Sequence, residues 1–129
     1  MTRKHKILLV DDDIDFVEST KTVLESKPYE VIVAYDGAEG IKKAKEENPD
    51  LVILDIIMPV KDGFSAAEQF KNDRELSKIP VIMLTSFSAK HDEAAIPVSS
   101  GMMLDADDYI EKPIEPTVLL KTIGKYLNK

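Results

Sequence analysis

The chain has 129 residues, 43% hydrophobic and 32% charged, with a formal net charge of −7 and no cysteine. This balance predicts one soluble domain without disulfides or thiolate metal sites. The negative charge argues against direct binding of nucleic acid or an anionic membrane, because both require basic patches. No apolar run approaches the ~20 residues of a membrane span, and the first is too short for a signal peptide, so we expect a cytoplasmic protein.

Short apolar segments alternate with amphipathic segments along the chain. The apolar segments are rich in Val and Ile and show little alternation, which predicts parallel strands buried on both faces. We expect these strands at Ile7–Val10, Val31–Ala34, Leu51–Leu54, Val81–Leu84 and Tyr109–Ile110. The amphipathic segments predict helices at roughly Ile14–Ser26, Ala38–Glu47, Phe64–Asn72, Ala89–Met103 and Glu115–Leu127.

The strict alternation of strand and helix predicts an α/β fold. Such an order forms a parallel sheet with right-handed crossovers and helices on both faces. Asp36 is expected to cap the second helix, and Asn48 and Pro49 to end it. In sheets of this kind, ligands bind beyond the carboxyl ends of the strands, so the residues after each strand are the candidate site.

Polar side chains follow four of the expected strands. A single Asp at a strand end is usually a cap or turn residue, but the joint placement of several groups indicates a site. Clustered carboxylates favour Mg²⁺, and a carboxylate can attack phosphorus to form an aspartyl-phosphate. A metal ion, an ammonium group and a hydroxyl can neutralise and orient a transferring phosphoryl group. The set is Asp11, Asp12 and Asp13 after the first strand, Asp55 after the third, Thr85 after the fourth and Lys112 after the fifth.

Four segments, in order, resemble the receiver domain of two-component response regulators: LLVDD, LVILDIIMPVKDG, VIMLTS and ADDYIEKP. The resemblance covers essentially the whole chain and implies one receiver domain over residues 1–129. It implies a flavodoxin-like (βα)5 fold, a doubly wound parallel five-stranded sheet with strand order 2-1-3-4-5.

The resemblance also implies a function, that of a phosphoacceptor switch. A sensor histidine kinase or a histidine phosphotransfer protein would donate the phosphoryl group. Phosphorylation would shift the face formed by the fourth helix, fifth strand and fifth helix, which a downstream effector protein or domain reads. Self-catalysed transfer and slow autodephosphorylation would make the protein a switch rather than an enzyme. A homodimer formed on activation is compatible with this reading.

By the same resemblance, the metal-binding and acceptor positions are assigned residue by residue. Asp55 matches the phosphoacceptor. Asp11 and Asp12 match the acidic pair that binds Mg²⁺, with Asp12 the closer ligand and Asp11 acting largely through water. Asp55 and the backbone carbonyl of Ile57 would complete the protein's share of the coordination.

The remaining matched positions concern switching and structure. Thr85 matches the switch hydroxyl, Tyr109 the aromatic switch residue, and Lys112 the amine that pairs with Asp55 or its phosphate. The matched structural positions are Pro59, Gly63 and Pro113, the last in a Lys-Pro bond that is commonly cis in the family.

The sequence departs from the familiar pattern between Thr85 and Lys112. This stretch is about five residues longer than usual and contains Pro97, which predicts a fourth helix that is shortened, broken or preceded by a loop. The extra length is either a tolerated surface insertion or a modified partner face. Apolar Ile57 and Phe87 near the site predict slow autodephosphorylation.

Two other readings are open at this point. Asp13–Val17 fits the DxDxV motif of haloacid-dehalogenase-like phosphatases, but Asp13 lies two residues past the strand end, where we expect a cap for the first helix. Lys112 also follows the Asp107–Asp108 pair, whereas in that family it precedes the pair. The second reading is a degenerate receiver that only binds partners. A flavodoxin is disfavoured because no phosphate loop rich in Ser, Thr or Gly follows the first strand.

Overall fold

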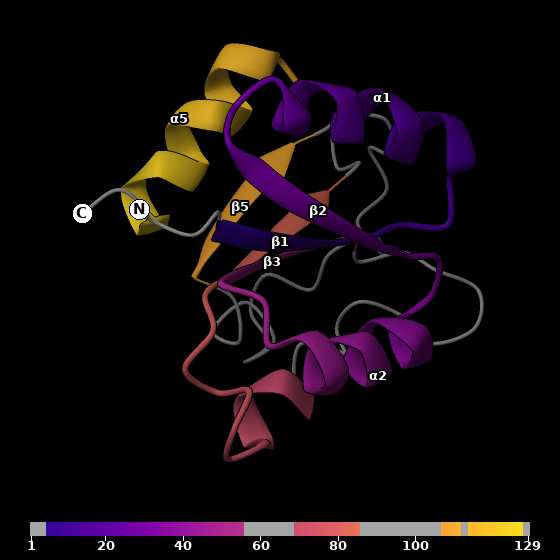
Figure 1. The fold of residues 1–129 in the computed structure, drawn as a ribbon, viewed down its shortest axis with the longest axis vertical. Helices are drawn as coiled ribbons and strands as arrows, with labels where there is room; N and C mark the ends of the chain where they lie inside the picture. Colours follow the sequence, from indigo (N-terminus) through magenta and orange to yellow (C-terminus); the bar gives the residue numbers. More distant parts are fainter. Residues whose placement is uncertain (1–4, 56–68, 86–106, 112–113, 128–129) are drawn as a thin grey trace, which may run out of the picture.

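The computed structural model describes residues 5–55, 69–85, 107–111 and 114–127. Within them, five strands form one sheet in the order β2-β1-β3-β4-β5, and every pairing is parallel (Figure 1). The strands are β1 (His5–Val10), β2 (Tyr29–Ala34), β3 (Leu51–Asp55), β4 (Val81–Thr85) and β5 (Asp108–Glu111). The five predicted strands and their predicted order are confirmed, and each strand extends one or two residues beyond at least one of its predicted ends.

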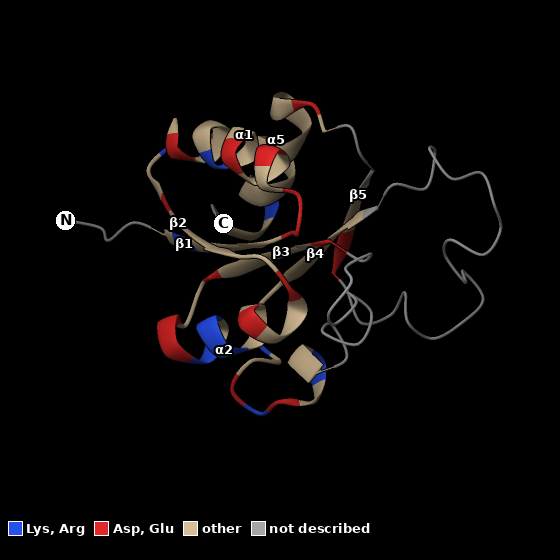
Figure 2. Ribbon diagram, turned by 90° about the vertical axis from the view of Figure 1, so that its right-hand side faces the viewer, with Lys and Arg blue, Asp and Glu red and all other residues tan. Residues whose placement is uncertain are grey.

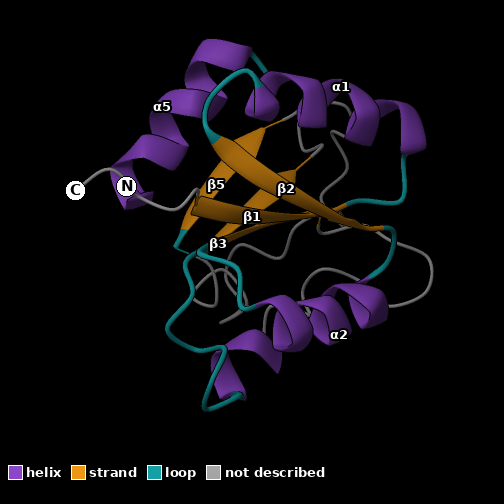
Figure 3. Cartoon of the chain, viewed as in Figure 1, coloured by secondary structure: helices purple, strands orange, loops and turns teal. Residues whose placement is uncertain are grey.

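Helices cover both faces of this sheet. α1 (Ile14–Glu25) and α5 (Pro116–Leu127) lie on one face, and α2 (Gly37–Glu47) lies on the other (Figures 1 and 2). Residues 69–72 are also helical, on the side of α2, and are the described part of the expected third helix (Figure 3). The expected fourth helix, Ala89–Met103, lies outside the described residues together with Pro97 and Phe87.

Successive residues of the central strands contact different layers. Ile7 and Leu9 pack with residues of α1 and α5, whereas Leu8 and Val10 pack with residues of α2 and of the segment between β3 and β4. All four side chains are completely buried. The sheet therefore has a core on each face, which explains why its strands lack polar alternation.

Both ends of α2 follow the expected chemistry. Asp36 Oδ1 accepts a hydrogen bond from the Glu39 N–H at 2.8 Å, and Glu39 Oε1 accepts one from the Tyr35 N–H at 2.8 Å. The two bonds resemble a reciprocal capping box. At the other end, Asn48 adopts the left-handed conformation with φ 50° and donates its N–H to the Ala44 carbonyl. The predicted cap and the predicted end of this helix are confirmed, and the helix begins at Gly37, one residue before the predicted Ala38.

Polar contacts tie α5 to the beginning of β5. The Tyr126 hydroxyl lies 3.0 Å from the Asp107 carbonyl oxygen and 3.1 Å from Asp108 Oδ2, and Lys125 Nζ lies 3.3 Å from the same carboxylate. Burial alone would raise the pKa of Asp108, but hydrogen bonds from a backbone N–H, Lys125 and Tyr126 leave that pKa below its ordinary value. Asp107 Oδ2 accepts the Val81 N–H at 2.8 Å. These bonds anchor β5 at the end opposite the candidate site.

Gly40 lies where α2 packs on β1. A Cβ at this position would lie 2.9 Å from Val10 Cγ2 and 3.2 Å from Val10 Cγ1. Alanine normally favours a helix interior by about 1 kcal/mol over glycine, but Val10 is completely buried and stiff at χ1. We expect Gly40→Ala to lower the free energy of unfolding in urea by about 1–3 kcal/mol. The cost should shrink in a Val10→Ala background, and a Gly40→Ala protein more stable than the wild type would contradict this packing.

Candidate metal and phosphoacceptor site

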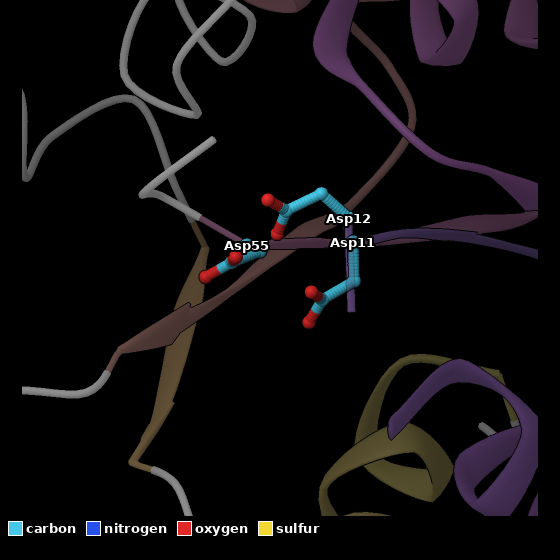
Figure 4. A group of neighbouring side chains, drawn as sticks. All are labelled: Asp11, Asp12 and Asp55. Carbon is cyan, nitrogen blue, oxygen red and sulfur yellow. The ribbon is translucent and has the colours of Figure 1, made fainter. Parts of the chain in front are cut away.

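Strand register brings the candidate carboxylates together. β1 and β3 are neighbours, and Val10 is opposite Leu54. Asp11, the first residue after β1, therefore lies beside Asp55, the last residue of β3. One carboxylate oxygen from each of Asp11, Asp12 and Asp55 lies within 4.8 Å of the others, and the three side chains converge at this end of the sheet (Figure 4). The predicted acidic cluster is confirmed as a geometric unit.

Burial makes this cluster electrostatically costly. Asp11 is completely buried and Asp55 is 4% exposed, whereas Asp12 is exposed to solvent. Two ionised carboxylates at this separation repel by on the order of 3 kcal/mol at an effective dielectric constant of about 20. A hard divalent cation offsets such repulsion, and Mg²⁺ accepts a few carboxylates while keeping several waters. One exposed carboxylate beside two buried ones fits that preference, since it leaves the solvent side open.

The backbone holds Asp11 in a defined orientation. Its N–H donates to the Ala34 carbonyl at 3.1 Å, which ties the residue to the end of β2. Its Oδ1 accepts the Asp13 N–H at 3.0 Å. This second bond was not anticipated from the sequence, although an Asp side chain often accepts the N–H of the residue two positions on.

Asp13 and Asp15 do not belong to the cluster. Asp13 Oδ1 accepts the Phe16 N–H at 3.1 Å and is the N-cap of α1, as expected. Asp15 is an exposed residue of the first helical turn. Asp13 is thus used as a cap where the phosphatase reading requires a nucleophile, so the geometry does not support that reading.

Two further candidates lie on neighbouring strands. Thr85 is the last residue of β4, one position beyond Leu84, which is opposite Asp55. Its backbone therefore reaches the same end of the sheet. Tyr109, in β5, is opposite Met83, is partly buried, and packs against the core on the α2 side. The remaining predicted site residues lie outside the described residues: Ile57, Pro59, Gly63, Lys112 and Pro113.

The fold and this site define a class, a doubly wound parallel α/β domain with a cluster of acidic side chains at the carboxyl end of its sheet. The family model described as the response regulator receiver domain matches residues 7–124. The chain belongs to this family. In the described part of the chain, every helix is too short or too polar to cross a membrane.

Curated relatives support the assignment. Protein PilH of Pseudomonas aeruginosa is 37% identical over 122 residues, which cover 95% of this chain and 97% of PilH. The alkaline phosphatase synthesis transcriptional regulatory protein PhoP of Bacillus subtilis is 39% identical over 111 residues, 86% of this chain but only 43% of PhoP. The chain therefore matches PilH over nearly its full length but spans less than half of PhoP.

Solved structures of response regulators support the same family assignment. A response regulator from Chloroflexus aurantiacus superposes with a TM-score of 0.85 at 30% identity, covering 98% of this chain and 99% of that one. Response regulator TrrA of Thermotoga maritima, solved in complex with Mg²⁺-BeF, superposes with a TM-score of 0.82 at 32% identity, covering 95% and 99%. These likenesses confirm the flavodoxin-like receiver fold expected from the sequence.

Proposed function

We propose that Asp55 is the residue at which this receiver domain accepts a phosphoryl group, in a reaction that requires Mg²⁺. The observation that carries the proposal is the position of Asp55 at the end of β3, almost completely buried and within 4.8 Å of Asp11 and Asp12. The donor is a sensor histidine kinase or a histidine phosphotransfer protein. A downstream effector reads the result.

The chemistry follows from the carboxylates. An oxygen of Asp55 attacks phosphorus, the bond from phosphorus to the donor nitrogen breaks, and an aspartyl-phosphate forms. Asp11, Asp12 and Asp55, with the backbone carbonyl of Ile57, would hold Mg²⁺, which supplies charge neutralisation when bound. TrrA in its complex with Mg²⁺-BeF supports this choice of metal.

The switching part of the proposal rests on strand position. Thr85 is the last residue of β4, which pairs with β3, the strand that ends in Asp55. Tyr109 lies in β5, opposite Met83 of β4. We assign Thr85 to binding of the phosphoryl group and Lys112 to pairing with the charge of Asp55 or its phosphate. We assign Tyr109 to the conformational response of the face formed by the fourth helix, the fifth strand and the fifth helix. On this account the protein is a switch whose only chemistry is self-catalysed transfer and slow loss of the phosphoryl group.

Magnesium should stabilise the folded protein through this cluster. A ligand present at 100 times its Kd adds about 2.7 kcal/mol to the free energy of unfolding. We expect the melting temperature of the wild type to rise when MgCl₂ replaces a chelator at constant ionic strength. The rise should largely disappear in Asp11→Asn, which removes one buried carboxylate but can still accept the Asp13 N–H.

Asp15→Asn is the matched control for this measurement. It makes the same change of charge at an exposed position of α1, outside the cluster. Its magnesium response should equal that of the wild type. An Asp11→Asn protein that responds to MgCl₂ as strongly as Asp15→Asn would contradict the proposed metal site.

A further inference from the structure

The outer edge of β2 is the starting point for an inference that does not concern phosphorylation. Among the strands that the structure describes, β2 is the first of the sheet and pairs with another strand on its β1 side alone (Figure 1). Its sequence, YEVIVA, is rich in β-branched residues. A strand edge of this composition can template the addition of another strand, and natural proteins protect such edges.

Hydrogen bonding shows which backbone groups of β2 face outward. The Ala34 carbonyl accepts the Asp11 N–H at the end of β1, so the backbone groups of Ala34 point toward β1. Backbone groups of successive strand residues point to alternate sides. Val33 and Tyr35 therefore present their N–H and C=O groups to the outside, where an added strand would bind them.

Two side chains of α2 occupy groups on this outer edge. Lys43 Nζ donates to the Val33 carbonyl at 2.6 Å, and Glu39 Oε1 accepts the Tyr35 N–H at 2.8 Å. Lys43 Nζ also lies 3.4 Å from Glu39 Oε2, one helical turn away. The two side chains thus form an ion pair, while Lys43 binds a carbonyl of β2 and Glu39 binds the N–H of Tyr35, the residue that follows β2.

We propose that Glu39 and Lys43 form an edge guard that prevents β2 from pairing with β2 of a second copy of the chain. A second copy is the occupant that the geometry favours, because an antiparallel pairing of two identical strands about a two-fold axis is self-complementary. In that pairing Glu39 and Lys43 of each copy would contact β2 of the other copy. The Lys43 ammonium would then lose its hydrogen bond to the Val33 carbonyl. Charged side chains, Lys in particular, are one of the ways in which natural proteins protect an edge strand from pairing.

The guard can be removed without opening the core. The side chains of Lys43 and Glu39 are 35% and 36% exposed, whereas the buried residues of α2 are Gly37, Gly40 and Ala44. Lys43→Ala is therefore expected to fold. Lys42→Ala is its matched control, since Lys42 is exposed on the same helix and carries the same charge.

The test is the mass of each full-length variant in solution, measured by light scattering after gel filtration over a range of concentrations, without Mg²⁺ or a phosphodonor. We expect Lys43→Ala, and more strongly Glu39→Ala/Lys43→Ala, to shift toward twice the mass of the wild type as concentration rises. Lys42→Ala and Lys43→Arg should match the wild type. In the associated variant, the amides of Val31 and Val33 should exchange more slowly with solvent deuterium.

Two results would overturn the proposal. One is a Lys43→Ala protein, and a double variant, whose mass follows that of Lys42→Ala at every concentration. The other is association of Lys43→Ala without slower exchange at Val31 and Val33, because the copies would then meet through another surface. Circular dichroism of each variant verifies that the comparison is made between folded proteins.

Discussion

Asp55→Asn is expected to abolish the magnesium-dependent phosphorylation of the chain by a small acyl phosphate. Asparagine has the shape of aspartate but no nucleophilic carboxylate, so no acyl phosphate can form at position 55. The intact mass of the wild type, incubated with the phosphodonor and MgCl₂, should show one added phosphoryl group. The mass of Asp55→Asn should not change under the same conditions, and neither should that of the wild type in the presence of a chelator.

Asp13→Asn is the informative control, because it separates the two phosphoryl-transfer chemistries open to the sequence. Asparagine is as good an N-cap as aspartate, so the bond to the Phe16 N–H and the start of α1 are retained. Asp13→Asn should be phosphorylated like the wild type. Labelling that persists in Asp55→Asn and disappears in Asp13→Asn would instead support a haloacid-dehalogenase-like mechanism and refute the receiver mechanism.

Phe70→Ala is expected to cause a large loss of stability. Phe70 is completely buried in the core on the α2 side, in one cluster with Leu54 of β3 and Met83 of β4. Truncation of a buried Phe leaves a cavity and typically lowers the free energy of unfolding by about 3–5 kcal/mol. Urea unfolding followed by circular dichroism should show this as a lower midpoint with an unchanged slope.

Two comparisons make the Phe70 result specific. Phe70→Leu keeps most of the volume and should cost about 1 kcal/mol. Ile14→Ala removes apolar atoms from a side chain that is 62% exposed, and its effect should stay within about 0.5 kcal/mol. A Phe70→Ala protein that unfolds at the same urea concentration as Ile14→Ala would show that this core does not support the sheet as described.

Hydropathy pattern was sufficient to predict the sheet, because strands buried on both faces are short and almost wholly apolar. It placed the strand ends less well. β1 begins at His5 rather than Ile7, and β5 ends at Glu111 rather than Ile110. These end residues are polar, and their assignment comes from ladder pairing, such as Lys6 with Glu30, rather than from burial. Pairing of this kind depends on the neighbouring strand and is invisible in a local pattern.

The acidic cluster could be predicted because it requires only that β1 and β3 be neighbours. The contacts around it required more. One is the bond from the Asp13 N–H to Asp11, which depends on the conformation of the turn after β1. The others are the bonds between α2 and the edge of β2, which depend on how the helix packs on the sheet. From its sequence context alone, Lys43 is one of many surface lysines. Its position against Val33 follows only from the packing of α2.

The most direct test of the account is to locate the phosphoryl group on the wild-type chain. Borohydride reduces an aspartyl-phosphate to homoserine, which leaves a permanent mark in the peptide that carried it. After phosphorylation in the presence of Mg²⁺, reduction and digestion, mass spectrometry should find homoserine at position 55 and aspartate unchanged at positions 11, 12 and 13. Homoserine at position 13, or at any position other than 55, would contradict the assignment of Asp55 as the phosphoacceptor.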